Sequence, residues 1–358
     1  MFEFDTTQVC KEDPMKHRKT AKFIFSLIMI LSLALSGAVT ATAEPTGDFV
    51  SAQINVAEDF TLHVTAYADD EITTPTMRFV GAGRDMTVDG VKRGGFWRFS
   101  FPKIFAQYMA DDFTIQLKNG DTVLQERDFS IVSYFSSIYN STASELGLSS
   151  AQFTSLKTFM ADMLEFGAAA QVYVEHGTDN LANSAAWVAS SKTAGYTAPT
   201  SVRNVTFNAG ANDRFTAASV RVENYVRLQF MIKATNADRV KIRVGSNSPF
   251  TYMLESVESD GLYHILTDGI MAINYGDVWT LTLTDADDTD YSTVTYSVNS
   301  YIVSKDSSTI PGLADIVRAM YNYGASAKAY SLAIGSEQIT LPGDGGILDD
   351  GITWGDIL

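Results

Sequence analysis

Two stretches of the chain match each other without a gap: FWRFSFPKIFAQYMADDFTIQL at 96–117 and LYHILTDGIMAINYGDVWTLTL at 262–283. Apolar residues hold the same places in both, and the paired positions include Trp97 and Tyr263, Phe99 and Ile265, Ile104 and Ile270, and Phe113 and Trp279. Self-similarity over such a length indicates an internal repeat. We therefore expect the chain to contain two diverged copies of one module.

A second pair of matching stretches follows in the same order along the chain. LKTFMADMLEFGAAA at 156–170 aligns with LADIVRAMYNYGASA at 313–327. In both, apolar residues recur at spacings of three and four, which is typical of a helix with one buried face. Each copy is therefore predicted to end in a strong helix.

The segments before these helices alternate between apolar and polar residues. Examples are 62–66, 113–117 and 226–230, and a period of two marks strands with one buried face. Asn119-Gly120-Asp121 and the run 285–290 interrupt the pattern at matching places, as hairpin turns do. Short helices are expected at 129–139 and 296–304, directly before the strong helices.

This order of elements predicts an α+β fold of two tandem diverged modules. Each module is expected to be an antiparallel β-sheet or sandwich followed by a C-terminal helical pair. The predicted boundaries are a signal peptide at 1–43, modules at 47–183 and 205–335, a linker at 184–204 and an acidic, glycine-rich tail at 336–358.

The predicted signal peptide has three parts. Basic residues follow Met15, an uncharged apolar run covers 23–35, and Ala41-Thr42-Ala43 gives a small-x-small cleavage pattern before Glu44. A membrane anchor is the alternative, but the apolar run is shorter than the roughly 20 residues that spanning requires. Residues 1–14 are acidic at four positions, so Met15 is the expected start. The predicted location is extracellular or at the cell surface.

Cysteine content and net charge exclude several kinds of chemistry and partner. The only cysteine, Cys10, precedes the predicted cleavage site, so the mature chain would have no disulfide, thiolate metal site or cysteine nucleophile. The full chain carries a net charge of −16, and removal of five Lys/Arg and four Asp/Glu with the signal peptide leaves −17. Such a balance argues against nucleic acid as a partner.

Several residues also resemble a known module. Residues 164–171 (LEFGAAAQ) with 179–183 (DNLAN), and again 321–328 (YNYGASAK), resemble the Tyr-Gly-Ala-Ala-Ala-Gln repeat module of large secreted surface proteins of gut clostridia. The resemblance covers roughly residues 50–335, with departures at Phe166, Ser326 and Lys328. The module has no assigned chemistry, so the resemblance implies a surface role and transfers no catalytic residues.

No catalytic residues are predicted, because the sequence contains no nucleophile elbow, Ser-x-x-Lys motif or phosphate loop. His63, His176 and His264 lack a second ligand at metal-binding spacing, so no metal site or cofactor is expected. His176 is predicted to lie at a helix C-terminus. The aspartates of 285–290 could supply calcium ligands, but they lack the glycine and the glutamate of the twelve-residue loop and fit a turn better.

Two glycines and four tryptophans remain. Gly167 and Gly324 fall inside apolar helical stripes, where glycine costs about 1 kcal/mol relative to alanine, so both are expected to mark close packing rather than a ligand groove. Trp97 and Trp279 are expected in the core. Trp187 and Trp354 have no periodic partner and are either local packing residues or contacts to a sugar or protein.

The sequence leaves the ligand-binding residues unknown and three functions open. The leading hypothesis is a secreted or cell-surface non-enzymatic binding, adhesion or scaffold module that contacts an extracellular glycan or a host protein. The alternatives are a carbohydrate-active hydrolase with dispersed Asp and Glu residues, since such pairs have no fixed spacing, and a purely structural spacer.

Overall fold

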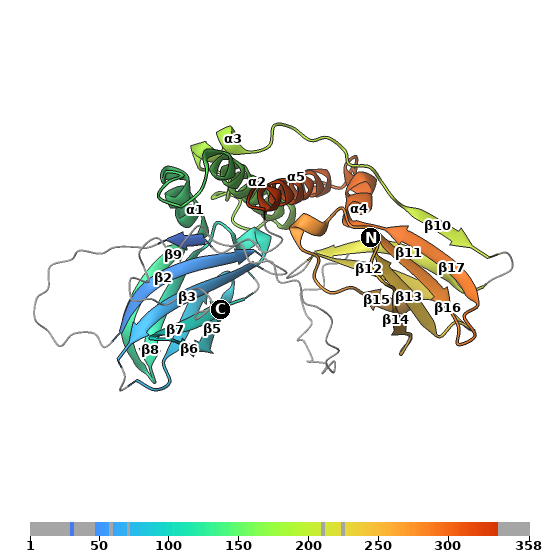
Figure 1. Ribbon diagram of the computed structural model, residues 1–358, viewed down its shortest axis with the longest axis horizontal. Helices are drawn as coiled ribbons and strands as arrows, with labels where there is room; N and C mark the ends of the chain where they lie inside the picture. Colours follow the sequence, from blue (N-terminus) through green and yellow to red (C-terminus); the bar gives the residue numbers. More distant parts are fainter. Residues whose placement is uncertain are drawn as a thin grey trace, which may run out of the picture.

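The computed structural model describes residues 29–31, 47–56, 60–69, 72–102, 104–208, 212–222 and 226–335. Most of the predicted signal peptide, Trp354 and the whole tail at 336–358 lie outside these residues. Two β-sandwiches lie at opposite ends of the molecule, and the long helices lie between them (Figure 1). The fold is α+β with antiparallel sheets, as predicted.

The first sandwich consists of two antiparallel sheets. One has the order β1-β2-β3-β7-β6, and the other has the order β5-β4-β8-β9. Their bounds are β1 Met29–Leu31, β2 Gly47–Val56, β3 Phe60–Ala68, β4 Thr76–Gly81, β5 Arg84–Asp89, β6 Val91–Arg93, β7 Phe96–Phe101, β8 Asp112–Asn119 and β9 Thr122–Ser130. β1 belongs to the segment predicted to be a signal peptide, so a cleaved chain would not contain it.

Aromatic side chains join the two sheets of this sandwich. Phe101 of β7 stacks on Phe79 of β4, with ring centroids 5.0 Å apart, and meets Phe113 of β8 edge to face at 5.8 Å. All three are fully buried. The alternation read from the sequence therefore directs these rings into one core between the sheets.

The second sandwich also consists of two antiparallel sheets. Its sheets have the orders β11-β12-β15 and β10-β17-β16-β13-β14. The bounds are β10 Asn204–Phe207, β11 Arg214–Val222, β12 Val226–Lys233, β13 Arg239–Val244, β14 Phe250–Met253, β15 Tyr263–Leu266, β16 Trp279–Thr284 and β17 Asp290–Tyr296. β12 pairs with β15 as β3 pairs with β7, and β13 pairs with β16 as β4 pairs with β8.

The helices follow the strands, as the sequence predicts. α1 (Ile131–Asn140) and α2 (Ser150–Val174) follow the first sandwich, and α4 (Val298–Lys305) and α5 (Leu313–Ala333) follow the second. Short 3-10 turns precede β8 and β16, namely η1 (Ala106–Tyr108) and η2 (Ala272–Asn274). α2 begins with a capping box, in which the Ser149 side chain accepts from the Gln152 backbone and the Gln152 side chain accepts in return.

The predicted hairpin turns are confirmed. Asn119 pairs with Thr122 at the end of β8 and β9, and residues 285–289 connect β16 to β17. The segment predicted to be a linker, 184–204, contains a short helix, α3 (Ala186–Ser191), whose Val188 is fully buried. This apolar side chain holds the connection against the core.

Candidate functional site: the groove between the two long helices

The two long helices pack against each other in opposite directions. Phe159 of α2 stacks on Tyr330 of α5, and Phe166 of α2 stacks on Tyr323, with ring centroids 6.0 and 5.7 Å apart. All four rings are buried. We call this contact, defined by Phe159, Phe166, Tyr323 and Tyr330, the helix junction.

The predicted close packing of both glycines is confirmed. A Cβ at Gly167 would lie 2.9 Å from Met109 Sδ and 3.2 Å from the Ala106 carbonyl oxygen. A Cβ at Gly324 would lie 2.6 Å from Tyr275 Cδ2 and 3.0 Å from the Ala272 oxygen. Each glycine thus lets its helix rest on the 3-10 turn of its own half of the chain.

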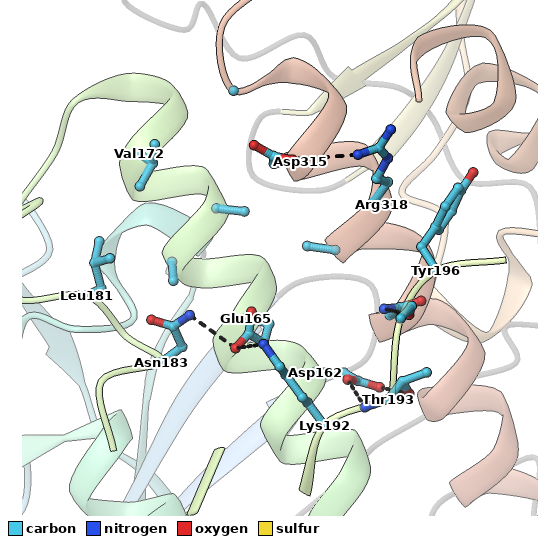
Figure 2. Close-up of a pocket in the computed structure, with 16 residues that line it drawn as sticks. Asp162, Glu165, Val172, Leu181, Asn183, Lys192, Thr193, Tyr196, Asp315 and Arg318 are labelled. Carbon is cyan, nitrogen blue, oxygen red and sulfur yellow. Dashed lines mark hydrogen bonds and ion pairs between the residues drawn. The ribbon is translucent and has the colours of Figure 1, made fainter. Parts of the chain in front are cut away.

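A groove of about 450 Å³ runs along one side of the helix junction, between α2, α5 and the connection that follows α3 (Figure 2). Its floor consists of small side chains, and charged and amide side chains stand on both walls. The lining residues are Asp162, Glu165, Ala168, Ala169, Val172, Leu181, Asn183, Lys192, Thr193, Gly195, Tyr196, Gly312, Asp315, Arg318, Ala319 and Asn322. Alanines on both helices leave the space that larger residues would fill.

One end of the groove is crossed by residues 192–196, which we call the strap. The Thr193 backbone N–H donates to Asp162 Oδ1 at 2.8 Å, and the Thr193 hydroxyl donates to Asp162 Oδ2 at 2.6 Å. Lys192 forms an ion pair with Glu165 at 2.8 Å, and Asn322 of α5 donates to the Gly195 carbonyl at 3.0 Å. The strap is therefore fastened to both long helices.

Asp162 is the buried anchor of the strap, with only 1% of its surface exposed. Burial raises its pKa, whereas the hydrogen bonds from Thr193 and from Ser326 act in the opposite direction. Glu165, one helical turn further along α2, contributes a smaller upward effect on the same pKa. Both Asp162 oxygens are thus occupied by protein donors.

The α5 wall of the groove presents Arg318. Its guanidinium lies 3.9 Å from Asp315, over the ring of Tyr196 at 5.8 Å, and it donates to the Asp306 backbone carbonyl. The Tyr196 hydroxyl donates to Asp306 Oδ2 at 3.2 Å. Burial, followed by the Asp306 carboxylate, raises the pKa of Tyr196 to about 12. In Figure 2, Asp315 and Arg318 stand across the groove from Val172 and Leu181.

These contacts limit what the groove can do chemically. Of its three carboxylates, Asp162 is engaged at both oxygens and Glu165 accepts from Lys192 and Asn183 at one oxygen. Only the Asp315 side chain is largely exposed, at 78%. The groove therefore offers an apolar floor with amide, guanidinium and carboxylate groups at its edges, which suits the orientation of a bound ligand.

The three histidines lie far apart in the fold. His63 is buried in β3, where its Nδ1 lies 2.8 Å from Ser100 Oγ, and burial, with a smaller contribution from Arg98, lowers its pKa to about 3. His176 follows the end of α2, as predicted, and contacts Asp111 at 3.1 Å. The His264 ring lies 2.9 Å from Asp260. None of them reaches the groove.

The aspartate run at 285–290 forms a turn in which the Asp285 carboxylate accepts hydrogen bonds from backbone and side-chain groups of the same turn. Asp285 accepts from the backbone N–H groups of Asp287 and Thr289, both at 2.9 Å, and from the Tyr291 hydroxyl at 2.9 Å. Within the described part of the chain, no three His, Cys, Asp or Glu side chains cluster in a way that could hold a metal ion. Nor is any helix there both long enough and apolar enough to cross a membrane.

Gln171, near the end of α2, holds the loop that follows this helix. Its side chain is fully buried, donates to the carbonyls of Gly177 and Asn180, and accepts from the Ala182 backbone N–H. One glutamine thus fixes the loop that carries Leu181 to the groove. Lys328, the aligned residue in α5, is exposed.

The tryptophans divide as the sequence suggested. Trp97 is buried and Trp279 packs against the core. Trp187 stacks on Tyr139 at 4.8 Å and donates to Ser136 Oγ at 3.0 Å, so it is a local packing residue.

No family model matches the chain, and no curated protein matches it. Among solved structures, the chain is similar to one described as "Ca2+-stabilized adhesin helps an Antarctic bacterium reach out and bind ice". The identity is 14%, the match covers 66% of this chain and 43% of that one, and the TM-score is 0.14. This chain therefore spans less than half of the adhesin, and a TM-score this low does not indicate a shared fold.

Proposed function

We propose that this protein is a secreted or cell-surface module that binds or scaffolds without catalysing a reaction. In this proposal the two sandwiches are diverged copies of one module and are held as a single rigid unit. The observation that carries it is the helix junction, in which Phe166 stacks on Tyr323, the residue aligned with it in the second copy. A purely flexible tandem would not bury four aromatic rings between its halves.

The engaged carboxylates favour binding over hydrolysis. A glycosidase needs two acids roughly 5–10 Å apart in a cleft, one to donate a proton and one to act as base or nucleophile. In the groove, Asp162 is fully occupied by Thr193 and Glu165 is paired with Lys192. Because both of these acids fasten the strap, no unengaged acid stands beside Asp315, which itself pairs with Arg318, among the lining residues.

Rigidity can be tested directly, because the mature chain would contain no cysteine. Nitroxide labels at Asp121→Cys and Asp287→Cys, in exposed turns of the two sandwiches, should give one narrow distance distribution. F166A/Y323A should broaden it, since the stacked pair is lost. F105A/Y108A is the matched control, because that ring pair lies within the first half of the chain. A broad distribution in the parent protein would contradict the proposal.

Binding and catalysis are separated by two assays on the same purified full-length mature chain. A glycan array should show retained ligands, and a panel of chromogenic glycosides should show no product. Product that disappears in D315N and E165Q would establish the hydrolase instead. Failure to bind any glycan or extracellular protein, together with a narrow label distance, would favour the spacer.

A further inference from the structure

Strand β1 covers an edge of the first sandwich that the mature chain would leave open. β1 pairs antiparallel with β2, with Met29 opposite Ile54 and Leu31 opposite Ala52. All of β1 lies within the predicted signal peptide, so cleavage after Ala43 would remove it. The backbone N–H and C=O groups on that side of β2 would then lose their partner strand.

β2 lacks the features that normally protect an edge strand. Such strands commonly carry charged side chains, proline or a bulge, which prevent pairing with a further strand. In the first sandwich β5, β6 and β9 lie at sheet edges, and each carries at least two charged residues. Residues 51–56 of β2 contain neither charge nor proline, and the bulge of this strand lies before them, between Phe49 and Ser51. This stretch therefore has the character of a strand that is paired on both sides.

The end of α5 lies on the side of the molecule where this edge is found. The Gln152 side chain, near the start of α2, donates to the Ala333 carbonyl at 3.2 Å. Lys157 of α2 lies over the Tyr139 ring of α1 at 4.3 Å. α1 in turn lies against β1, above the first sandwich in Figure 1. The chain that follows α5 therefore starts close to α1 and to the edge of β2.

The tail contains a short segment with the sequence pattern of a strand. Ile352-Thr353-Trp354 alternates apolar and polar residues of high β-propensity and has the same length as β1. Residues 336–351 precede it and can extend about 50 Å, whereas α1 is only about 15 Å long. Ile339-Thr340-Leu341 has a similar pattern, but residues 336–338 can extend only about 10 Å. The segment 352–354 is therefore the one with enough chain before it to pass α1.

We infer that in the mature chain Ile352–Trp354 adds to the edge of β2 in the place that β1 holds here. A segment of the same chain has an advantage over a separate partner, because tethering gives it an effective concentration in the millimolar range. Trp354, which has no periodic partner in the sequence, would then contact the first sandwich. This inference goes beyond the proposed function and requires only that residues 29–31 are removed on secretion.

Hydrogen exchange of the mature chain, residues 44–358, tests this pairing. Those amides of 51–56 that point away from β3 should exchange slowly. I352P/T353P should accelerate their exchange at least about tenfold. Neighbouring residues of a strand point their N–H groups to opposite sides, so one of the two prolines must remove a bond to β2. G345P/G346P, with two prolines in the preceding segment, is the matched control and should exchange as the parent does. The amides of 113–117 in β8 should exchange equally in all three proteins.

Crosslinking gives a second readout that does not depend on proline. Because the mature chain would contain no cysteine, Q53C/T353C carries only the introduced pair. A short bismaleimide should join this pair within one chain at least about tenfold faster than it joins Q53C/T340C, in which the nearer tail segment carries the cysteine. Sedimentation should show a monomer.

Several results would overturn the inference. Fast exchange of the β2 edge in the parent, equal exchange in I352P/T353P and the parent, or equal crosslinking at residues 340 and 353 would show that the segment does not pair there. A dimer whose β2 protection falls on dilution would assign the edge to a second copy. Amino-terminal sequencing that finds residues 29–31 retained would leave β1 in place. Glycan or protein binding is measured separately, so this inference and the proposed binding function can fail independently.

Discussion

Tyr275 lies so close to Gly324 that a Cβ at residue 324 would meet the ring carbon Cδ2 at 2.6 Å. The matching contact in the first half is looser, because the partner of Gly167 is the flexible Met109 at 2.9 Å. The two aligned glycines thus differ in how far the neighbouring side chain can move to make room for a Cβ.

We expect G324A to destabilise the protein by about 2 kcal/mol and G167A to change stability by less than about 1 kcal/mol. The methionine can rotate away, and alanine recovers about 1 kcal/mol of helix propensity, whereas a buried tyrosine ring cannot easily move. Leucine at either position should cost several kcal/mol. Urea unfolding measures these differences, and equal stabilities for the two alanine variants would contradict the prediction.

Acid should weaken the first sandwich through His63. Because its pKa in the folded protein is lowered from about 6.5 to about 3, the unfolded chain takes up a proton first as pH falls. Stability from this neutral histidine is complete above pH 6.5 and is lost between about pH 6.5 and 3, by about 2 kcal/mol at pH 5. Urea unfolding of H63Q should show a shallower loss between pH 7 and 5. Equal slopes for H63Q and the parent protein would contradict this prediction.

The strap should depend on Asp162 more than on Glu165. D162A removes two hydrogen bonds to a carboxylate at a buried site, each worth about 1.5–3 kcal/mol, and should free the strap. Limited trypsin digestion should then cut after Lys192. E165Q breaks a partly exposed ion pair worth less than about 1 kcal/mol, so it should leave Lys192 protected. Equal protection in both variants would show that other contacts hold the strap.

Exchanging the aligned residues Gln171 and Lys328 should have unequal effects. Q171K places an ammonium where three hydrogen bonds now hold the loop 177–182, and we expect a loss of about 3 kcal/mol or more. K328Q changes an exposed residue and should stay within about 0.5 kcal/mol of the parent. Thermal unfolding of the two variants decides this. A neutral Q171K would mean that the loop is fixed by its other contacts.

Local patterns were sufficient to predict the helices, the hairpin turns and the packing of both glycines. The spacing of apolar residues shows which face of a helix or strand is buried, and this pattern lies within one short segment of the sequence. The strap was missed because Asp162 and Thr193 are 31 residues apart, and no short-range signal connects a mid-helix aspartate to a distant threonine.

Strand pairing was not predictable for a related reason. Arg214 and Lys233 become partners only through the register of β11 on β12, and a bulge between Phe215 and Ala217 shifts that register by one residue. The linker prediction at 184–204 overlooked α3, because composition does not reveal that Val188 has a place in the core.

The stacking of Phe166 on Tyr323 has a further consequence for ancestry. A residue that contacts its own counterpart is the signature of a two-fold interface between identical subunits. If the two halves arose by duplication, the helix junction preserves within one chain the interface of an ancestral homodimer. Fusion would then have allowed the two sides to diverge, since Asp162, which holds the strap, aligns with Ala319 in the second half. Contacts on the two-fold axis of that dimer would then involve both halves equally. Contacts away from the axis, such as those of the groove, would be found in one copy only.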